Sequence, residues 1–330
     1  MGTTPEELAR QLATLAKPVT EFTAASSLLD CLRKAQTYSS PAAMEPLKVF
    51  AAAGGVRALG AAMKANSPVY SEWPEGQQPV IDLAEVHKEA SGFLNNLAAA
   101  ALAGHEDITS ELRAADIVPI MVDTVDAFKE RPEVTHRVLP ALAQLASLLP
   151  DAVEASDAVS VVVRAMHAAD ANDVWIQCSG ARLLHVLLAH GLGGERAAHA
   201  KRALLHAGAL GAIVRALDAA PDEAKLPRGF SFDVNQLRQK LAAMGAPLMR
   251  QLGALVAELY APDTRGALTG LVGRADLNGC AAVIVKPTAD EAAGLRAKGR
   301  VKVRAANAAS EETLAVQYKN FEVDGLVDLS

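Results

Sequence analysis

Histidine and cysteine, the side chains that most often bind metals or attack substrates, are scattered along this chain. His199 and His206 are seven residues apart and could share one face of a helix, but no cysteine or carboxylate stands at ligand spacing beside them. The HExxH motif of zinc hydrolases is absent. Cys178 falls inside an expected helix without a local histidine partner, so we interpret it as a small buried apolar residue.

Two glycine-rich stretches have the composition of phosphate-binding loops. One is His-Gly-Leu-Gly-Gly at 190–194, and the other spans 266–273. Each lacks the preceding strand and the Lys-Ser/Thr pair that a nucleotide-binding loop requires. We therefore predict no catalytic, cofactor or metal site, and we expect the chain not to be an enzyme.

Four aromatic side chains stand in polar, proline-containing segments that we expect to be loops, at 66–84 and 219–234. They are Tyr70, Trp73, Phe230 and Phe232. Aromatic residues are enriched among the side chains that dominate protein interfaces, so these four are candidate partner contacts. The alternative is that they fold back over the edge of the helices.

Basic residues alternate along one expected strand and its approach. They are Arg296, Lys298, Arg300, Lys302 and Arg304. A period of two places them on one face, which could bind an acidic ligand, nucleic acid or phospholipid. The alternative is a solvated outer face whose charges protect the edge of a sheet. The net charge of −6 gives no general reason to expect a nucleic-acid partner.

The composition favours a helical protein. Of the 330 residues, 51% are hydrophobic and 4% aromatic, which is ample for a core, and the length predicts two or three domains. Ala and Leu, which favour helix, are abundant. Three widely spaced cysteines predict a reducing compartment without disulfides. We find no signal-peptide pattern and no apolar run of ~18 residues, so we expect no membrane span and a cytoplasmic location, with the nucleus as the alternative.

A short phrase recurs four times along the first two thirds of the chain. It reads Ala-Gly-Gly-Val at 53–56 and returns near Asp116, Asp157 and Gly208. At these positions a glycine tolerates the left-handed backbone of a tight turn, and an aspartate can cap the next helix. Self-similarity on this scale is typical of stacked helical units that bury their apolar faces against one another.

Each of these four turns is followed by two expected helices. The second helices of the units are expected at 56–65, 118–128, 159–168 and 210–219. The longer closing helices are expected at 87–101, 134–149, 174–190 and 245–261. Their apolar residues recur at spacings of three and four, which predicts one buried stripe per helix. Residues 5–50 are expected to form N-terminal capping helices.

The pattern resembles the armadillo repeat over residues 20–261. The resemblance lies in the phrases Leu-Lys-Val-Phe-Ala-Ala-Ala-Gly-Gly-Val at 47–56, Ala-Leu-Leu-His-Ala-Gly-Ala-Leu at 203–210 and Ala-Ser-Gly-Phe-Leu-Asn-Asn-Leu-Ala at 90–98. It implies a right-handed α-solenoid of about four repeats. The concave face of such a solenoid, lined by the closing helices, would bind an extended or helical segment of another protein. HEAT-type repeats are the alternative fold.

The armadillo resemblance also singles out candidate contacts in the groove. In several armadillo proteins an asparagine of the closing helix clamps the backbone of an extended peptide, because its amide is both donor and acceptor. The aligned positions here hold Asn96, Gln144, Val186 and Ala254. Asn96 and Gln144 are therefore candidate partner contacts, together with Arg182 of the third closing helix. Gly92 stands where the nuclear-import receptors have tryptophan, which disfavours binding of nuclear-import signals. The alternative role of the amides is hydrogen bonding at helix ends.

After Pro262 the sequence changes to short alternating segments. Strands are expected at 267–272, 281–286, 300–304 and 313–317, with turn residues at 270–279. The phrases Leu-Val-Gly-Arg-Ala-Asp-Leu-Asn-Gly at 271–279, Gly-Arg-Val-Lys-Val at 299–303 and Tyr-Lys-Asn-Phe at 318–321 resemble small SH3-like modules. The resemblance implies a small SH3-like β-barrel, from which a long loop expected at 287–298 departs.

We therefore predict a mainly α protein with an armadillo-like helical domain at 1–261 and an SH3-like barrel at 262–330. Its expected function is that of a non-enzymatic scaffold or adaptor for other proteins, without a cofactor and with nucleic acid disfavoured as a partner. The alternative function is binding of an acidic ligand, nucleic acid or phospholipid through the basic strand. The sequence predicts no oligomeric state.

Overall fold

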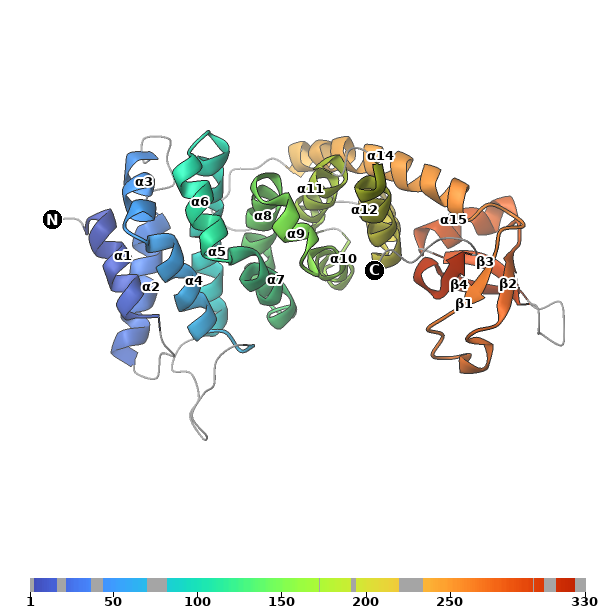
Figure 1. Ribbon diagram of the computed structural model, residues 1–330, viewed down its shortest axis with the longest axis horizontal. Helices are drawn as coiled ribbons and strands as arrows, with labels where there is room; N and C mark the ends of the chain where they lie inside the picture. Colours follow the sequence, from blue (N-terminus) through green and yellow to red (C-terminus); the bar gives the residue numbers. More distant parts are fainter. Residues whose placement is uncertain are drawn as a thin grey trace. The chain divides into compact units, whose positions relative to one another are not determined.

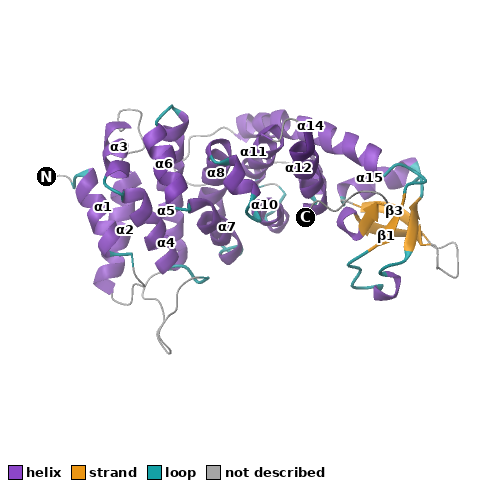
Figure 2. Ribbon diagram, viewed as in Figure 1, coloured by secondary structure: helices purple, strands orange, loops and turns teal. Residues whose placement is uncertain are grey.

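The structure of the protein is a computed structural model (Figure 1). It describes residues 3–16, 22–36, 44–69, 82–171, 173–190, 194–219, 234–298, 300–305 and 313–323. The chain divides into two compact units, Met1–Ala169 and Asp170–Ser330, and each is described by itself. Figure 2 shows helices throughout the first unit and a β-sheet beside helices in the second. The domain boundary predicted at 261/262 falls inside the second unit and stays a prediction.

The first unit has its helices in the order that the repeat pattern predicts. It begins with α1 (Pro5–Thr14) and α2 (Phe22–Gln36). One triplet follows, α3 (Met44–Ala52), α4 (Gly55–Ala65) and α5 (Leu83–Leu102). The next triplet is α6 (Glu106–Ala114), α7 (Ile117–Ala127) and α8 (Pro132–Leu148). The unit ends with α9 (Pro150–Glu154) and α10 (Ala158–Ala168).

The closing helix α5 is the centre of the first unit, because it packs against both α2 and α8. Phe93, Leu94 and Leu97 of α5 are fully buried. The ring of Phe93 meets that of Phe50 in α3 edge to face, with centroids 5.0 Å apart. Burying one such side chain contributes roughly 1.5–3 kcal/mol, so this apolar stripe holds the helices of the unit together.

The turns that precede the second helices have the predicted left-handed backbone in three cases out of four. The angle φ is +76° at Gly54 and +50° at Asp116, and it is +87° at Gly208 in the second unit. Asp157 has an ordinary φ of −77°. Neither aspartate side chain makes a capping hydrogen bond, so the predicted capping role of these residues is wrong.

Gly55 is required for a different reason from its neighbour Gly54. A Cβ atom at Gly55 would collide with the ring of Phe50, because α4 begins directly against α3. Gly54 therefore serves the backbone of the turn, since only glycine adopts a positive φ without strain, whereas Gly55 serves the packing. The pair of glycines that marks the first repeat thus has two independent causes.

His87 of α5 is fully buried and connects three helices of the first unit. Its Nε2 lies 3.1 Å from the carbonyl oxygen of Asn66, and its Nδ1 lies 2.8 Å from the hydroxyl of Thr124 in α7. Burial lowers the pKa of His87 to about 4, so the ring is neutral near pH 7. Because a carbonyl oxygen only accepts, Nε2 carries the hydrogen, and Nδ1 is the acceptor nitrogen. The Thr124 hydroxyl has a single proton, for which Nδ1 competes with the Ile120 carbonyl oxygen at 2.7 Å.

The second unit begins with the helices α11 (Val174–His190), α12 (Gly194–Ala207), α13 (Ala209–Asp218) and α14 (Val234–Leu259). The remaining two predicted closing helices correspond to α11 and to part of α14. The closing helix predicted at 245–261 is the second half of α14, which begins earlier than the sequence suggested. Both α11 and α13 pack against α14, as the closing-helix pattern predicts.

The sheet of the second unit is open. Its strands are β1 (Arg265–Leu268), β2 (Ala281–Ile284), β3 (Arg300–Ala305), β4 (Thr313–Gln317) and β5 (Phe321–Val323). They pair antiparallel in the order β4-β3-β2-β1-β5. Because β4 and β5 stand at opposite edges, the predicted closed barrel is wrong. The four predicted strands are present, and β5 is an additional one that follows the short 3₁₀ helix η5 (Tyr318–Asn320).

A cluster of aromatic rings joins the sheet to the helices of the second unit. Tyr260, which follows α14, lies against Tyr318 with ring centroids 4.8 Å apart and against Phe321 at 6.3 Å. The Tyr260 hydroxyl is 3.5 Å from Nε2 of His206 in α12. All three rings of the cluster are buried. Through this cluster the sheet packs on the last helices of its own unit.

The loop predicted at 287–298 is instead a helix, α15 (Ala289–Ala297), so this prediction is wrong. Its start is a capping box, in which the Glu291 amide donates to the Thr288 hydroxyl and the Thr288 amide donates to the Glu291 carboxylate. The hydrogen bonds from Lys302 and from the Thr288 amide lower the pKa of Glu291 to about 2. The helix packs against β3 and α13.

The buried state of His87 predicts a loss of stability in mild acid. The pKa of His87 is about 4 in the folded chain and 6.5 ordinarily. Between these two pH values the unfolded chain therefore binds a proton at His87 that the folded chain does not bind. His87 alone should therefore lower the free energy of unfolding by about 2 kcal/mol between pH 7 and pH 5. Urea unfolding at both pH values checks this. The His87→Gln variant should show a drop smaller by that amount, and equal drops in the two proteins would contradict the assignment.

The left-handed turns predict opposite effects of the same substitution at two equivalent positions. Asp116→Gly should raise the free energy of unfolding by about 1 kcal/mol, because glycine removes the strain of a positive φ. Asp157→Gly should lower it by about 0.5–1 kcal/mol, because the native φ is ordinary and glycine adds only unfolded-state entropy. Chemical denaturation measures both, and a shift of the same sign at the two sites would refute the explanation.

Candidate partner-binding site

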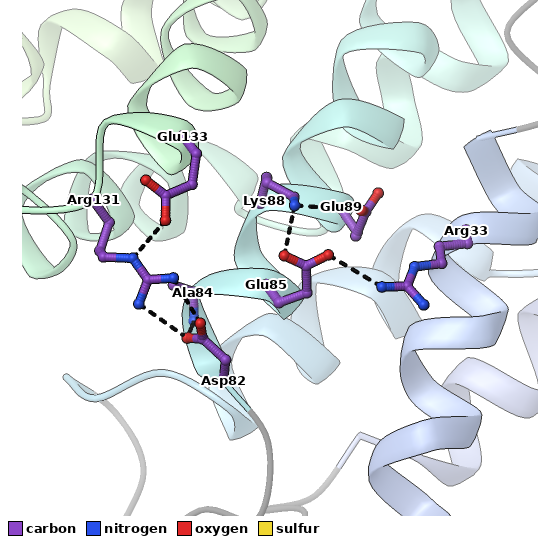
Figure 3. A network of polar contacts seen from close by, with 8 residues as sticks. All are labelled: Arg33, Asp82, Ala84, Glu85, Lys88, Glu89, Arg131 and Glu133. Atoms are coloured by element: carbon purple, nitrogen blue, oxygen red, sulfur yellow. Dashed lines mark hydrogen bonds and ion pairs between the residues drawn. The ribbon is translucent and has the colours of Figure 1, made fainter. Parts of the chain in front are cut away.

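A row of charged side chains crosses helix α2 and the closing helix α5 in the first unit (Figure 3). Arg33 of α2 donates to the Glu85 carboxylate of α5 at 3.2 Å, and Lys88 reaches the other oxygen of Glu85 at 2.6 Å. Lys88 also lies 3.8 Å from Glu89. Glu85 is thus held by two cations from two helices, and this fixes the direction in which its carboxylate points.

A second cluster joins the first residues of α5 and α8 (Figure 3). Arg131, just before α8, donates to the Asp82 carboxylate at 2.6 Å and to Glu133 at 2.5 Å. Asp82 is also the N-cap of α5, since its carboxylate accepts the Ala84 amide at 3.0 Å. One aspartate therefore starts a helix and ties it to the next closing helix.

The electrostatics of these clusters favour the charged forms of Glu85, Asp82 and Arg131. Burial raises the pKa of Glu85, but Lys88 and Arg33 outweigh it and hold the pKa below its usual range. The hydrogen bond from Arg131 lowers the pKa of Asp82, and Asp82 in turn raises the pKa of Arg131. The face consequently presents side chains of both signs in mutual ion pairs.

Two amides meet further along the same helices. Nε2 of Gln144 in α8 donates to Oδ1 of Asn95 in α5 at 2.5 Å and approaches the Asn95 backbone oxygen at 3.3 Å. Both side chains are partly exposed. Within the part of the chain that the structure describes, the Asn95 Nδ2 donors and the Gln144 Oε1 acceptor have no partner. The pair therefore offers one donor group and one acceptor side by side to a ligand.

The structure brings together only some of the predicted contact residues. Gln144 lies on α8 and is hydrogen-bonded to Asn95 of α5. The predicted contact Asn96, the next residue of α5, is half-buried. Arg182 is exposed on α11 and belongs to the second unit. Their roles stay predictions. The four predicted loop aromatics lie outside the described residues; they are Tyr70, Trp73, Phe230 and Phe232.

The sequence reasoning missed Asn95 and the ion-pair clusters. Asn95 could have been found by testing both residues of the Asn95-Asn96 pair against Gln144 of the next repeat. The Asp82 cluster had a sequence signal too, because an aspartate directly before an apolar helix is a typical N-cap. The pairing of Arg33 with Glu85 had none, since nothing in either segment specifies the other.

The basic strand has the predicted alternation only at Arg300, Lys302 and Arg304, because Arg296 belongs to helix α15 and Lys298 precedes the strand. Arg300 and Arg304 are exposed on β3, whereas Val301 and Val303 are buried. Lys302 is paired with Glu291 of α15 at 2.8 Å. The Arg296 side chain lies outside the described part of the structure. Lys298, which precedes β3, is exposed.

An additional arginine joins this face of the sheet. Arg265 of β1 stands opposite Val283 of β2, and Val283 stands opposite Arg304 of β3. Since directly paired residues share a face, Arg265 and Arg304 lie on the same side of the sheet. The basic face therefore extends beyond the strand that the sequence singled out.

Among the described residues, no three histidine, cysteine or acidic side chains gather as metal ligands would. Burial raises the pKa of the Cys178 thiol to about 11, which confirms its interpretation as a buried residue. In the same described part of the chain, the helices are too short or too polar to span a membrane.

Solved structures show which fold the helices form. A designed armadillo repeat protein in complex with the peptide (KR)4 is 19% identical, covers 78% of this chain and 91% of its own, and has a TM-score of 0.50. An engineered protein is 20% identical over 76% of this chain and 91% of its own, with a TM-score of 0.50. The helical part of this chain is an armadillo-like solenoid. No family model matches the sequence, and no curated protein matches it either.

The two roles of Asp82 in the armadillo-like solenoid can be separated by substitution. Asp82→Ala should lower the free energy of unfolding by about 1 kcal/mol, the usual cost of losing an N-cap. Asp82→Asn keeps the capping oxygen and loses only the ion pair with Arg131, whose partly exposed geometry makes it worth less than about 0.5 kcal/mol. Chemical denaturation compares the variants, and equal losses would show that the ion pair dominates.

Proposed function

We propose that this protein is a non-enzymatic scaffold that binds an extended segment of another protein along α2, α5 and α8. The observation that carries the proposal is the amide pair of Asn95 and Gln144 on two adjacent closing helices. The armadillo-like fold supports it, because solenoids of this kind present a continuous surface of parallel helices. The predicted concave face would be this layer of closing helices.

The amide pair has the chemistry that an extended backbone needs. A strand-like peptide presents carbonyl oxygens and amide hydrogens along its length, with no partner in its own chain. The remaining donors of Asn95 match a carbonyl, and the remaining acceptor of Gln144 matches an amide. Because each side chain is already held by the other, little rotamer entropy would be lost on binding.

The charged clusters indicate what kind of segment fits. Glu85, Glu89 and Glu133 alternate with Lys88 and Arg131 across the same helices, so the face has no single sign. A partner of mixed charge could exchange these exposed ion pairs for its own. Nucleic acid is disfavoured, because the carboxylates would repel a phosphate backbone.

A functional parallel comes from a designed protein of similar fold. The designed armadillo repeat protein with a TM-score of 0.50 is in complex with a peptide, (KR)4. We extend the peptide-binding role, and not that particular peptide, to this chain. We also assign it to the cytoplasm, with the nucleus as the alternative, in keeping with cysteines that form no disulfide.

A second candidate function is favoured by the basic face of the sheet. Arg265, Arg300 and Arg304 are exposed and form no ion pair within the described ranges. They could take an acidic ligand, nucleic acid or phospholipid. The strand order and the 3₁₀ helix before β5 are consistent with an SH3-like module at 262–330, which would add this second site to the solenoid.

The scaffold proposal is tested with peptides selected from a phage-displayed random library against the full chain. Asn95→Ala/Gln144→Ala should weaken the selected peptides about tenfold, because two backbone hydrogen bonds are lost. The double substitution removes both partners of the pair and so leaves no buried group unsatisfied. Fluorescence anisotropy with labelled peptides measures the dissociation constants.

Two comparisons complete this experiment. Gln251→Ala removes an exposed amide from α14 in the other unit and should leave binding unchanged. Asn96→Ala tests the residue that the sequence predicted. Selected peptides that bind the double variant as tightly as the wild type would move the binding site elsewhere, and a library that yields no binder would count against the function itself.

A further inference from the structure

A cavity of about 360 Å³ opens where α14 and α15 meet the end of the buried face of the sheet. Gly253, Val256 and Ala257 of α14 form one wall, and Ile284, Val301 and Tyr318 form the opposite one. Leu295 of α15 closes a side. The volume falls within the range of about 300–1,000 Å³ that is usual for small-molecule sites. All of these residues belong to the second unit.

Gly253 gives the cavity its depth on the side of α14. A Cβ atom built at Gly253 would meet no heavy atom within 4 Å. Glycine inside a helix costs about 0.5–1 kcal/mol relative to alanine, so it usually has a packing reason. Gly245, two turns earlier in α14, has such a reason, since a Cβ there would lie 3.2 Å from Ile213 and Leu217. A Cβ at Gly253 has no such contact, and the residue lines the cavity.

The charge at the mouth of the cavity is positive. Arg300 lines it, is exposed, and has no ion-pair partner in the described part of the chain. Lys302 also lines it, but Glu291 neutralises that ammonium at 2.8 Å. None of the described residues that line the cavity is a carboxylate. An apolar body would therefore fill the interior while an anionic end would meet the guanidinium of Arg300.

We propose that this cavity binds a small amphipathic carboxylate, with an aliphatic or aromatic body between α14 and the sheet and its carboxylate on Arg300. Guanidinium is the cation best suited to a carboxylate, because its parallel N–H groups match the two oxygens. The site is distinct from the peptide-binding face on α2, α5 and α8. It shares Arg300 with the basic face of the sheet, but its ligand also needs an apolar body to fill the cavity.

The test is calorimetric titration of the full chain with sodium decanoate, decanol and decylammonium. The wild type should bind decanoate at one site, decanol more weakly and decylammonium not at all. Gly253→Leu should weaken decanoate at least about tenfold, because the new side chain occupies the cavity. This variant should fold well, since leucine is a better helix former than glycine and its Cβ would meet no heavy atom within 4 Å. Its thermal unfolding is measured alongside.

Matched variants separate the cavity from its surroundings. Gly294→Leu adds the same side chain to α15 where a Cβ also meets nothing, but outside the cavity, and should leave binding unchanged. Arg300→Ala should weaken decanoate and spare decanol. Arg304→Ala, four residues further along the same face of β3, should change neither.

Four results would overturn the proposal. They are the absence of decanoate binding to the wild type, equal binding to Gly253→Leu, equal loss in Arg300→Ala and Arg304→Ala, and decanol binding as tightly as decanoate. If a second copy of the chain covers the cavity instead, Gly253→Leu would change the mass measured by light scattering and decanoate would not bind. That result also rejects the small-molecule site.

Discussion

The packing of α5 between α2 and α8 is the constraint on which the rest of the first unit depends. Phe93, Leu94 and Leu97 cannot be buried by α5 alone, so a single repeat would expose its apolar stripe. Stacking removes that surface from water and at the same time aligns the opposite faces of the closing helices. The charged side chains and the Asn95–Gln144 pair lie next to one another because the buried sides of the same helices fix the distance between the helices.

Much of this fold is encoded in local rules and could be predicted from the sequence. Gly54, Asp116 and Gly208 mark the turns because the backbone there is left-handed, a property of the residue and its two angles alone. Missed features divide into two kinds. The capping box of Thr288 and Glu291 was legible in the sequence and reveals α15. The open sheet was not, because barrel closure depends on whether β4 and β5 meet, and no local pattern encodes that.

The sequence predicted the kind of candidate site, amide side chains on the closing helices, but only one of the two residues that pair there, Gln144. Aligning the repeats led to Gln144 because the amide recurs in register. It led to Asn96 instead of Asn95, since neighbours on a helix differ by about 100° in direction and only the packing decides which one faces Gln144. Arg33 and Glu85 are 52 residues apart. Their pairing follows from the stacking of α2 on α5, so it becomes visible only in three dimensions.

The open sheet has a consequence for how the protein behaves at high concentration. A sheet with two edges offers unsatisfied backbone groups to any extended chain, which is the route to domain swapping and fibril growth. One edge strand, β5, is three residues long. On the other edge strand, β4, the outward residues are small or polar, namely Thr313, Ala315 and Gln317. Neither edge gives a foreign strand a long apolar register to follow. The shortness of β5 and the small or polar residues of β4 therefore disfavour aggregation through the sheet edges. A closed barrel prevents it differently, because it has no free edges.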